Sequence, residues 1–87
     1  MNRATVTSIL LDAGGPLWSS VECDRKQERW IIRARLNPRV ERSACDALRE
    51  SERVLNDVLP SYLGDSDWIA TVYWANRVSY TIARNRS

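Results

Sequence analysis

The sequence predicts an α/β fragment in which one buried N-terminal strand is followed by about three helices. Two observations favour this fold class. Residues 5–11, TVTSILL, are apolar and β-branched and end at DAGG, which is typical of a strand followed by a tight turn. Residues 38–59 carry apolar side chains at helical spacing. An alternative fold stays open, namely α+β with the order ββαββ and an antiparallel sheet.

The length of the chain limits it to one small domain. With 87 residues it buries only a little over ~60% of the surface of the unfolded chain. We expect residues 1–87 to form one domain or the N-terminal piece of a longer protein, with residues 1–19 as strand and glycine turn and residues 20–87 as a helical region. The chain lacks both a long apolar run and a signal-peptide pattern, so we expect a cytoplasmic protein with no membrane contact.

The composition excludes several kinds of site. The chain has no histidine, and its cysteines, Cys23 and Cys45, lack CxxC spacing, which removes most zinc sites and every histidine-dependent triad. We expect both thiols to be reduced. All basic residues except Lys26 are arginines, and acids are interleaved with them, so the sequence does not predict the concentrated basic face of a nucleic-acid-binding protein.

The first element is predicted as a strand covered on both faces. Ile9, Leu10 and Leu11 follow one another without alternation, which is the pattern of a strand in a parallel sheet. The glycines after Asp12 permit a tight turn at the end of this strand.

Residues 20–36 fit two interpretations. Ser19 and Glu22 have the spacing of a capping box, which predicts a helix over residues 22–36. The same stretch ends in WIIRARL, which also alternates as a strand would, with Trp30, Ile32, Ala34 and Leu36 on one side. Periodicity leaves both interpretations open.

The following segment is predicted as a helix. Asn37 is a suitable N-cap, Pro38 fits the first helical position, and Pro60 ends the helix. Arg42 with Asp46 and Arg53 with Asp57 form pairs of opposite charge four residues apart on its exposed side. Its apolar face is formed by Val40, Ala44, Ala47, Leu48, Ser51, Leu55 and Val58.

Residues 67–83 also fit two interpretations. After a turn at Gly64, Asp65 or Ser66 can cap a helix. The content of Trp, Ile, Thr, Val and Tyr favours instead a hairpin that turns near Asn76. In the hairpin, one face would carry Trp68, Ala70, Val72, Trp74, Val78, Tyr80 and Ile82.

The stretch ILLDAGGPL, residues 9–17, resembles the first motif of the haloacid dehalogenase-like hydrolase superfamily. That motif is a hydrophobic strand followed by Asp-x-Asp-Gly-Thr/Val-Leu, and variants with Asp-x-Gly-Gly are familiar in the superfamily. Beyond residue 17 the likeness is topological, because family members commonly insert a helical cap domain where residues 20–83 stand.

The resemblance implies an enzyme with an aspartate nucleophile and magnesium. Asp12 would be the nucleophile and a magnesium ligand, the backbone carbonyl of Gly14 would be a second ligand, and the substrate would be a small phosphate or halo-acid. Gly14 stands where the phosphatases of the family place their acid/base aspartate, which departs from the pattern. The later motifs are missing, and Lys26 falls in the expected first cap helix. The chain would therefore be the N-terminal portion of a hydrolase, inactive alone.

A second functional hypothesis comes from another class of protein. Four tryptophans, three tyrosines and many arginines are residue types enriched in protein-binding hot spots. They are consistent with a small non-catalytic protein-binding or inhibitory module, for example from a mobile element. Such a module would bind a protein partner, and exposed aromatic side chains would favour a homo-oligomer. We nevertheless expect Trp18, Trp30, Trp68 and Trp74 to lie mainly in the core.

Overall fold

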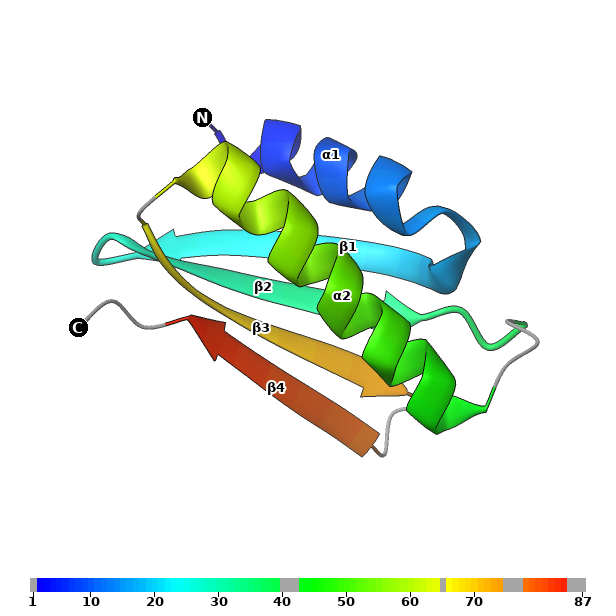
Figure 1. Cartoon of the computed structure of the whole chain (residues 1–87). Helices are drawn as coiled ribbons and strands as arrows, with labels where there is room; N and C mark the ends of the chain where they lie inside the picture. Colours follow the sequence, from blue (N-terminus) through cyan, green and yellow to red (C-terminus); the bar gives the residue numbers. More distant parts are fainter. Residues whose placement is uncertain (1, 40–42, 65, 75–77, 85–87) are drawn as a thin grey trace.

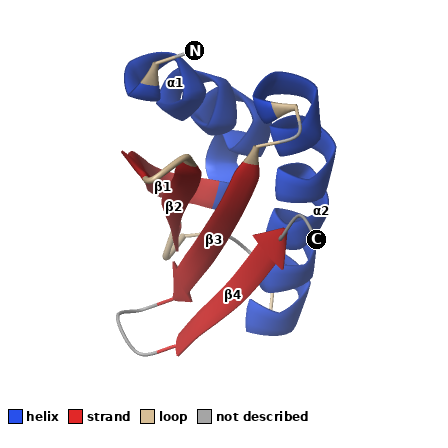
Figure 2. Ribbon diagram, turned by 90° about the vertical axis from the view of Figure 1, so that its left-hand side faces the viewer, coloured by secondary structure: helices blue, strands red, loops and turns tan. Residues whose placement is uncertain are grey.

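The computed structural model describes residues 2–39, 43–64, 66–74 and 78–84, the last of these by its backbone. These residues form two layers, with α1 and α2 on one side of a mixed sheet (Figure 1, Figure 2). The elements are α1 (Arg3–Gly14), the 3-10 turn η1 (Gly15–Leu17), β1 (Trp18–Lys26), β2 (Arg29–Leu36), α2 (Ala44–Leu63), β3 (Asp67–Trp74) and β4 (Val78–Arg84).

The four described strands lie in the order β1-β2-β3-β4. β1 pairs antiparallel with β2 through a two-residue turn, in which Gln27 and Glu28 both have positive φ, 50° and 68°. β2 pairs parallel with β3, and β3 pairs antiparallel with β4. The connection through α2 explains the parallel central pair, because it returns the chain to the end of the sheet where β2 began.

The fold class predicted first, one N-terminal strand followed by three helices, is wrong. Residues 5–11 belong to α1, which begins where the side chain of Asn2 accepts a hydrogen bond from the Thr5 backbone (2.8 Å). Val6 and Leu10 are buried four residues apart, while Leu11 is 38% exposed, so the apolar run is a helix packed on one side. Gly15, at φ 55°, caps the helix instead of ending a strand.

The two ambiguous segments are strands. Trp30, Ile32, Ala34 and Leu36 are all buried on the side of β2 that faces the helices, in the alternation expected for a strand. Trp68, Ala70 and Val72 repeat this pattern on β3, while Trp74 is 37% exposed. The helix predicted from the capping box is wrong, since Ser19 and Glu22 lie in β1.

The alternative fold, ββαββ with an antiparallel sheet, is also wrong as a whole. The strands and α2 follow one another in that order, but α1 precedes them and the sheet is mixed, because β2 and β3 pair in parallel. The hairpin turn predicted near Asn76 lies outside the described residues.

The predicted third segment is a helix, but its ends differ from the prediction. α2 begins after Ser43, whose hydroxyl accepts a hydrogen bond from the Asp46 backbone (3.2 Å). Asn37 instead accepts one from Arg39 (3.0 Å) in a turn. Pro60 lies inside the last turn, and its carbonyl accepts the capping bond of Gly64 (3.1 Å).

One of the two charge pairs predicted for α2 is confirmed, and the other cannot be compared with the described residues. Arg53 and Asp57 lie 3.5 Å apart and confirm one pair. Arg42, the basic member of the other pair, lies outside the described residues.

The core lies between the helices and the sheet. Leu10 of α1, Leu55 of α2 and Ile32 of β2 are fully buried there. A buried polar link crosses this core, because the Trp18 indole Nε1 donates to the Ser51 hydroxyl (2.8 Å), which donates to the Ala47 carbonyl (2.8 Å). The link fixes the start of β1 against the middle of α2.

Candidate functional site

The side of the sheet that faces away from α1 and α2 is the candidate site. Side chains alternate between the two faces of each strand, so those between the buried positions point away from the helices. The strand register aligns them in rows across β1, β2 and β3. The rows are Ser20–Arg35–Tyr73, Glu22–Arg33–Thr71 and Asp24–Ile31–Ile69, and we call these nine residues the open face.

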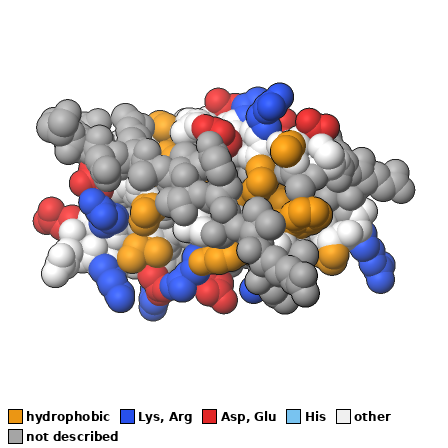
Figure 3. Space-filling model, turned by 90° about the horizontal axis from the view of Figure 1, so that it is seen from below, with side chains coloured by type: hydrophobic (Ala, Val, Ile, Leu, Met, Phe, Trp, Pro, Cys, Tyr) orange, Lys and Arg blue, Asp and Glu red, His pale blue; other side chains and the backbone are white. Residues whose placement is uncertain are grey.

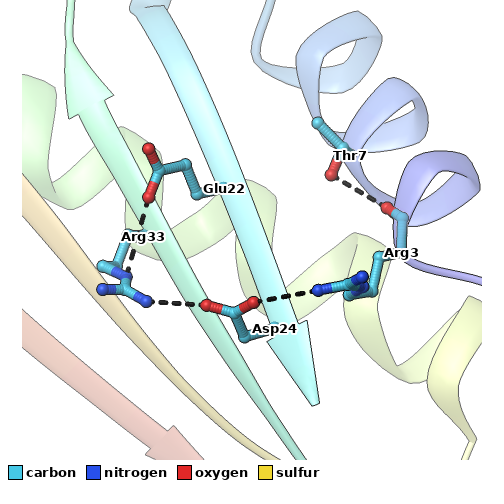
Figure 4. Close-up of polar contacts among 5 residues, drawn as sticks. All are labelled: Arg3, Thr7, Glu22, Asp24 and Arg33. Atoms are coloured by element: carbon cyan, nitrogen blue, oxygen red, sulfur yellow. Dashed lines mark hydrogen bonds and ion pairs between the residues drawn. The ribbon is translucent and has the colours of Figure 1, made fainter.

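An ionic network occupies the β1 side of the open face (Figure 4). Arg33 Nη2 lies 2.8 Å from Asp24 Oδ2, and Arg33 Nε lies 4.0 Å from Glu22 Oε2. Arg3 of α1 reaches the other Asp24 oxygen at 3.2 Å, while the Arg3 carbonyl accepts a bond from the Thr7 hydroxyl (2.8 Å). The network therefore joins α1, β1 and β2 at one edge of the sheet.

The network favours the charged forms of Asp24 and Arg33 but contributes little to the stability of the fold. The hydrogen bond from Arg33 holds the pKa of the Asp24 carboxyl below its usual range, and the same bond raises the pKa of Arg33. Their side chains are 39% and 43% exposed, and ion pairs at such exposure contribute little to folding. The main effect is to hold one guanidinium between two carboxylates.

Ile31 and Ile69 form an apolar centre beside the network, whereas a shallow depression on the same face has a mainly polar lining. Ile31 and Ile69 are register partners and are half-buried. The depression, about 250 Å³, is lined by Ser20, Glu22, Arg33, Ala34, Arg35 and Tyr73. In a view from below, opposite α1, hydrophobic side chains lie between basic and acidic ones (Figure 3). The visible charges are mixed in sign.

The two residues predicted as catalytic and metal-binding do not face the same way. Asp12 is exposed on α1, beside a depression formed by Ile9, Ala13, Val58 and Tyr62. Gly14 is buried at the end of α1, where a Cβ would stand 2.4 Å from the Trp18 ring. Neither residue follows a strand, so the expected placement of Asp12 at the carboxyl end of a buried strand is not found.

Neither metal binding nor thiol chemistry has further support among the described residues. They contain no group of three or more His, Cys, Asp or Glu side chains suited to a metal ion, and magnesium stays a prediction. Cys23 is buried and Cys45 exposed, both free. Burial raises the pKa of the Cys23 thiol, although a side-chain hydrogen bond with Thr7 opposes this, so Cys23 is a poor nucleophile at neutral pH.

Sequence reasoning did not identify the open face. The strand alternative for residues 29–36 implied that Ile31, Arg33 and Arg35 share a side. The strand alternative did not give the register of the sheet. The register places Glu22 and Asp24 of β1 beside these β2 residues, and it adds Tyr73 of β3, more than thirty residues further along the chain. The only signal available was the alternation itself.

Comparisons with protein-family models, with curated proteins and with solved structures gave no match. The described helices include none that is both long enough and apolar enough to cross a membrane.

Proposed function

We propose that this chain is a small non-catalytic protein-binding module that pairs with a second copy of itself through the open face. One observation carries the proposal. The described helices cover one side of the sheet, whereas the other side carries Ile31, Ile69 and Tyr73 beside charges that already neutralise one another. A surface with an apolar centre and a polar rim is the usual anatomy of a protein interface.

The charge layout favours a second copy as the occupant. The carboxylates of Glu22 and Asp24 stand on β1, and the guanidinium groups of Arg33 and Arg35 stand on β2. When two copies face each other around a two-fold axis with β1 over the partner's β2, the carboxylates of each copy lie opposite the guanidinium groups of the other, so this contact forms twice in the dimer. Complementary rows of this kind set the register of a dimer more than they add affinity.

The edge of the sheet favours contact through the face over strand addition. β1 is an edge strand, and its second half carries Asp24, Arg25 and Lys26. Charged residues on an edge strand discourage pairing with another strand. Association through the open face is therefore favoured over strand addition at β1.

The hydrolase hypothesis receives less support from the geometry. It depends on Asp12 standing at the carboxyl end of a buried parallel strand, where open α/β sheets bind ligands. Asp12 instead lies on the outer side of a helix. Activity of a longer form, with Asp12 as nucleophile, stays a prediction.

Sedimentation equilibrium over a wide range of protein concentration tests the dimer. We expect a monomer–dimer equilibrium, weakened at least ten-fold by Tyr73→Lys, which corresponds to about 1.4 kcal/mol. The matched control is Tyr62→Lys, since Tyr62 is a 47% exposed tyrosine on α2 and its replacement leaves the open face intact.

Two outcomes would overturn the proposal. One is a monomer at every concentration, and the other is a dimer weakened by Tyr62→Lys but not by Tyr73→Lys. If Tyr73→Lys does not fold, Ile69→Thr keeps a residue suited to a strand while removing the apolar contact, and it should weaken the dimer in the same direction.

A further inference from the structure

A second surface of the molecule lies between the two helices. Two adjoining depressions follow the seam of α1 and α2 and share Ala13 in their lining. The first, about 340 Å³, is bordered by Ile9, Asp12, Val58 and Tyr62. The second, about 240 Å³, includes Pro16, Glu50, Arg53 and Val54 in its lining. We call the two together the helix groove.

The length of the helix groove matches a short helix. Along α2 it extends from Glu50 to Tyr62, which at a rise of 1.5 Å per residue is about 18 Å. With a helical pitch of 5.4 Å, this distance accommodates a segment of about three turns.

The floor of the helix groove is apolar. Ile9 and Ala13 of α1 and Val54 and Val58 of α2 stand four residues apart on their helices, so each pair forms one apolar ridge. A channel between two such ridges fits the apolar stripe of another helix.

The composition of α1 also favours a second partner packed against the helix groove. Its only ionisable side chains are Arg3 and Asp12, and apolar residues occur on its outer flanks as well as its buried side. Ile9 is half-buried and Leu11 is 38% exposed. A helix with apolar residues around most of its circumference is usually covered on more than one side.

The charge of the helical layer favours a basic occupant. α1 and α2 together contain five acidic and three basic residues, a net charge of −2 in a chain whose total is +2. At the rim of the groove, Asp12 makes no hydrogen bond or ion pair with any residue that the structure describes, whereas Arg53 is held by Glu50 and Asp57. The groove therefore offers an unpaired carboxylate beside an apolar channel.

We infer that the helix groove binds a basic amphipathic helix of a partner protein, about three turns long, with its apolar stripe on the floor and a lysine or arginine near Asp12. A second copy of the chain fits this surface less well, because two helical layers of like net charge repel each other. The site is separate from the open face, and neither proposal depends on the other.

Two synthetic peptides provide the test. Both are helical peptides of about 14 residues with the same leucine and alanine stripe, and they differ only in carrying lysine or glutamate on the flanks. We expect the lysine peptide to bind and to shift the backbone amide resonances of α1 and α2 in nitrogen-15 spectra, leaving those of β1 and β2 unchanged. The glutamate peptide should bind at least roughly five-fold more weakly, the ratio for a contact worth about 1 kcal/mol.

Three variants locate the peptide. Ala13→Trp fills both depressions, and Asp12→Lys reverses the charge at the rim, so each should weaken binding of the lysine peptide at least about five-fold. Glu28→Lys, in the β1–β2 turn, changes the net charge equally and should alter binding by less than about two-fold, because distant exposed charges are screened.

Several results would overturn the inference. They are binding of neither peptide, equal binding of both, resonance shifts confined to the strands, or an equal loss with Glu28→Lys and Asp12→Lys. Failure of Ala13→Trp to weaken binding would also exclude the groove; should this variant not fold, Tyr62→Ala tests the same channel. Tyr73→Lys must leave peptide binding unchanged, which separates this test from that of the open face.

Discussion

α1 and α2 cover the same face of the sheet, but their sequences differ in kind. α2 alternates apolar and charged residues at helical spacing, and Arg53 pairs with Glu50 and Asp57 on its exposed side. α1 is rich in β-branched residues and carries only two ionisable side chains. The local sequence of α2 is thus enough to explain why it is a helix. The local sequence of α1 is not, and its helical conformation depends on its caps and on its packing against the sheet.

The largest expected effect comes from removing the packing on which α1 depends. Leu10 is fully buried and its neighbour Leu11 is 38% exposed. Leu10→Ala should lower the free energy of unfolding by about 2–5 kcal/mol, measured by urea denaturation. Leu11→Ala, the matched control, should change it by about 0.5 kcal/mol or less. Equal losses in the two variants would show that α1 does not pack through the Val6–Leu10 side.

The next effect concerns the ends of the two helices. Gly14→Ala would place a methyl group 2.4 Å from the Trp18 ring, and overpacking of this kind costs about 1–3 kcal/mol. Gly64→Ala, at the end of α2, meets open space and causes backbone strain alone at φ 60°. The indole resonance of Trp18 should move in the first variant and stay in place in the second; movement in both would contradict the close contact at Gly14.

A smaller effect is expected from the polar link between β1 and α2. Ser51→Ala leaves the buried Trp18 Nε1 without its acceptor, which should cost about 1–2 kcal/mol of unfolding free energy and shift the indole N–H resonance. Ser61→Ala is the control, because its exposed hydroxyl also bonds a carbonyl four residues earlier. No difference between the two variants would mean that Trp18 finds another partner.

The smallest expected effect is electrostatic and comes from the exposed ion pairs of Asp24. Because the pKa of Asp24 is lowered in the folded state by Arg33, its ion pairs stabilise the fold above the usual carboxyl pKa. This contribution should be lost as the pH falls below about 4 and through the lowered pKa. The difference in stability between wild type and Asp24→Asn, followed against pH, should shrink in acid and in high salt. A difference that does not change with pH would exclude the ion pairs as its source.

The comparison of the two helices also shows how far the sequence could predict the fold. The position of α2 followed from periodicity, and its start was misplaced because Asn37 and Pro38 form a turn with the same residue types as a helix start. The strand character of residues 29–36 was visible as alternation. α1 was missed because Asp12 and the glycines after it resemble a strand end, whereas Gly15 is a helix cap.

The candidate site was less accessible to prediction than the fold. A contiguous motif around Asp12 attracted the functional interpretation, since its residues are neighbours in the sequence. The open face is assembled from single residues two apart on three strands, and Glu22, Arg33 and Thr71 share a row only through the register. No pattern within one segment carries that information, because register depends on the tertiary structure.

The parallel pairing of β2 with β3 has a consequence for the order of folding. β1 and β2 are joined by two residues, whereas thirty residues, 37–66, separate the end of β2 from the start of β3. We therefore expect the centre of the sheet to close after the β1–β2 hairpin and α2 have formed, because long-range contacts carry the larger loop-closure entropy. Substitutions in α2 should slow refolding, whereas Leu10→Ala should mainly speed unfolding, and stopped-flow measurements of both rates distinguish the two.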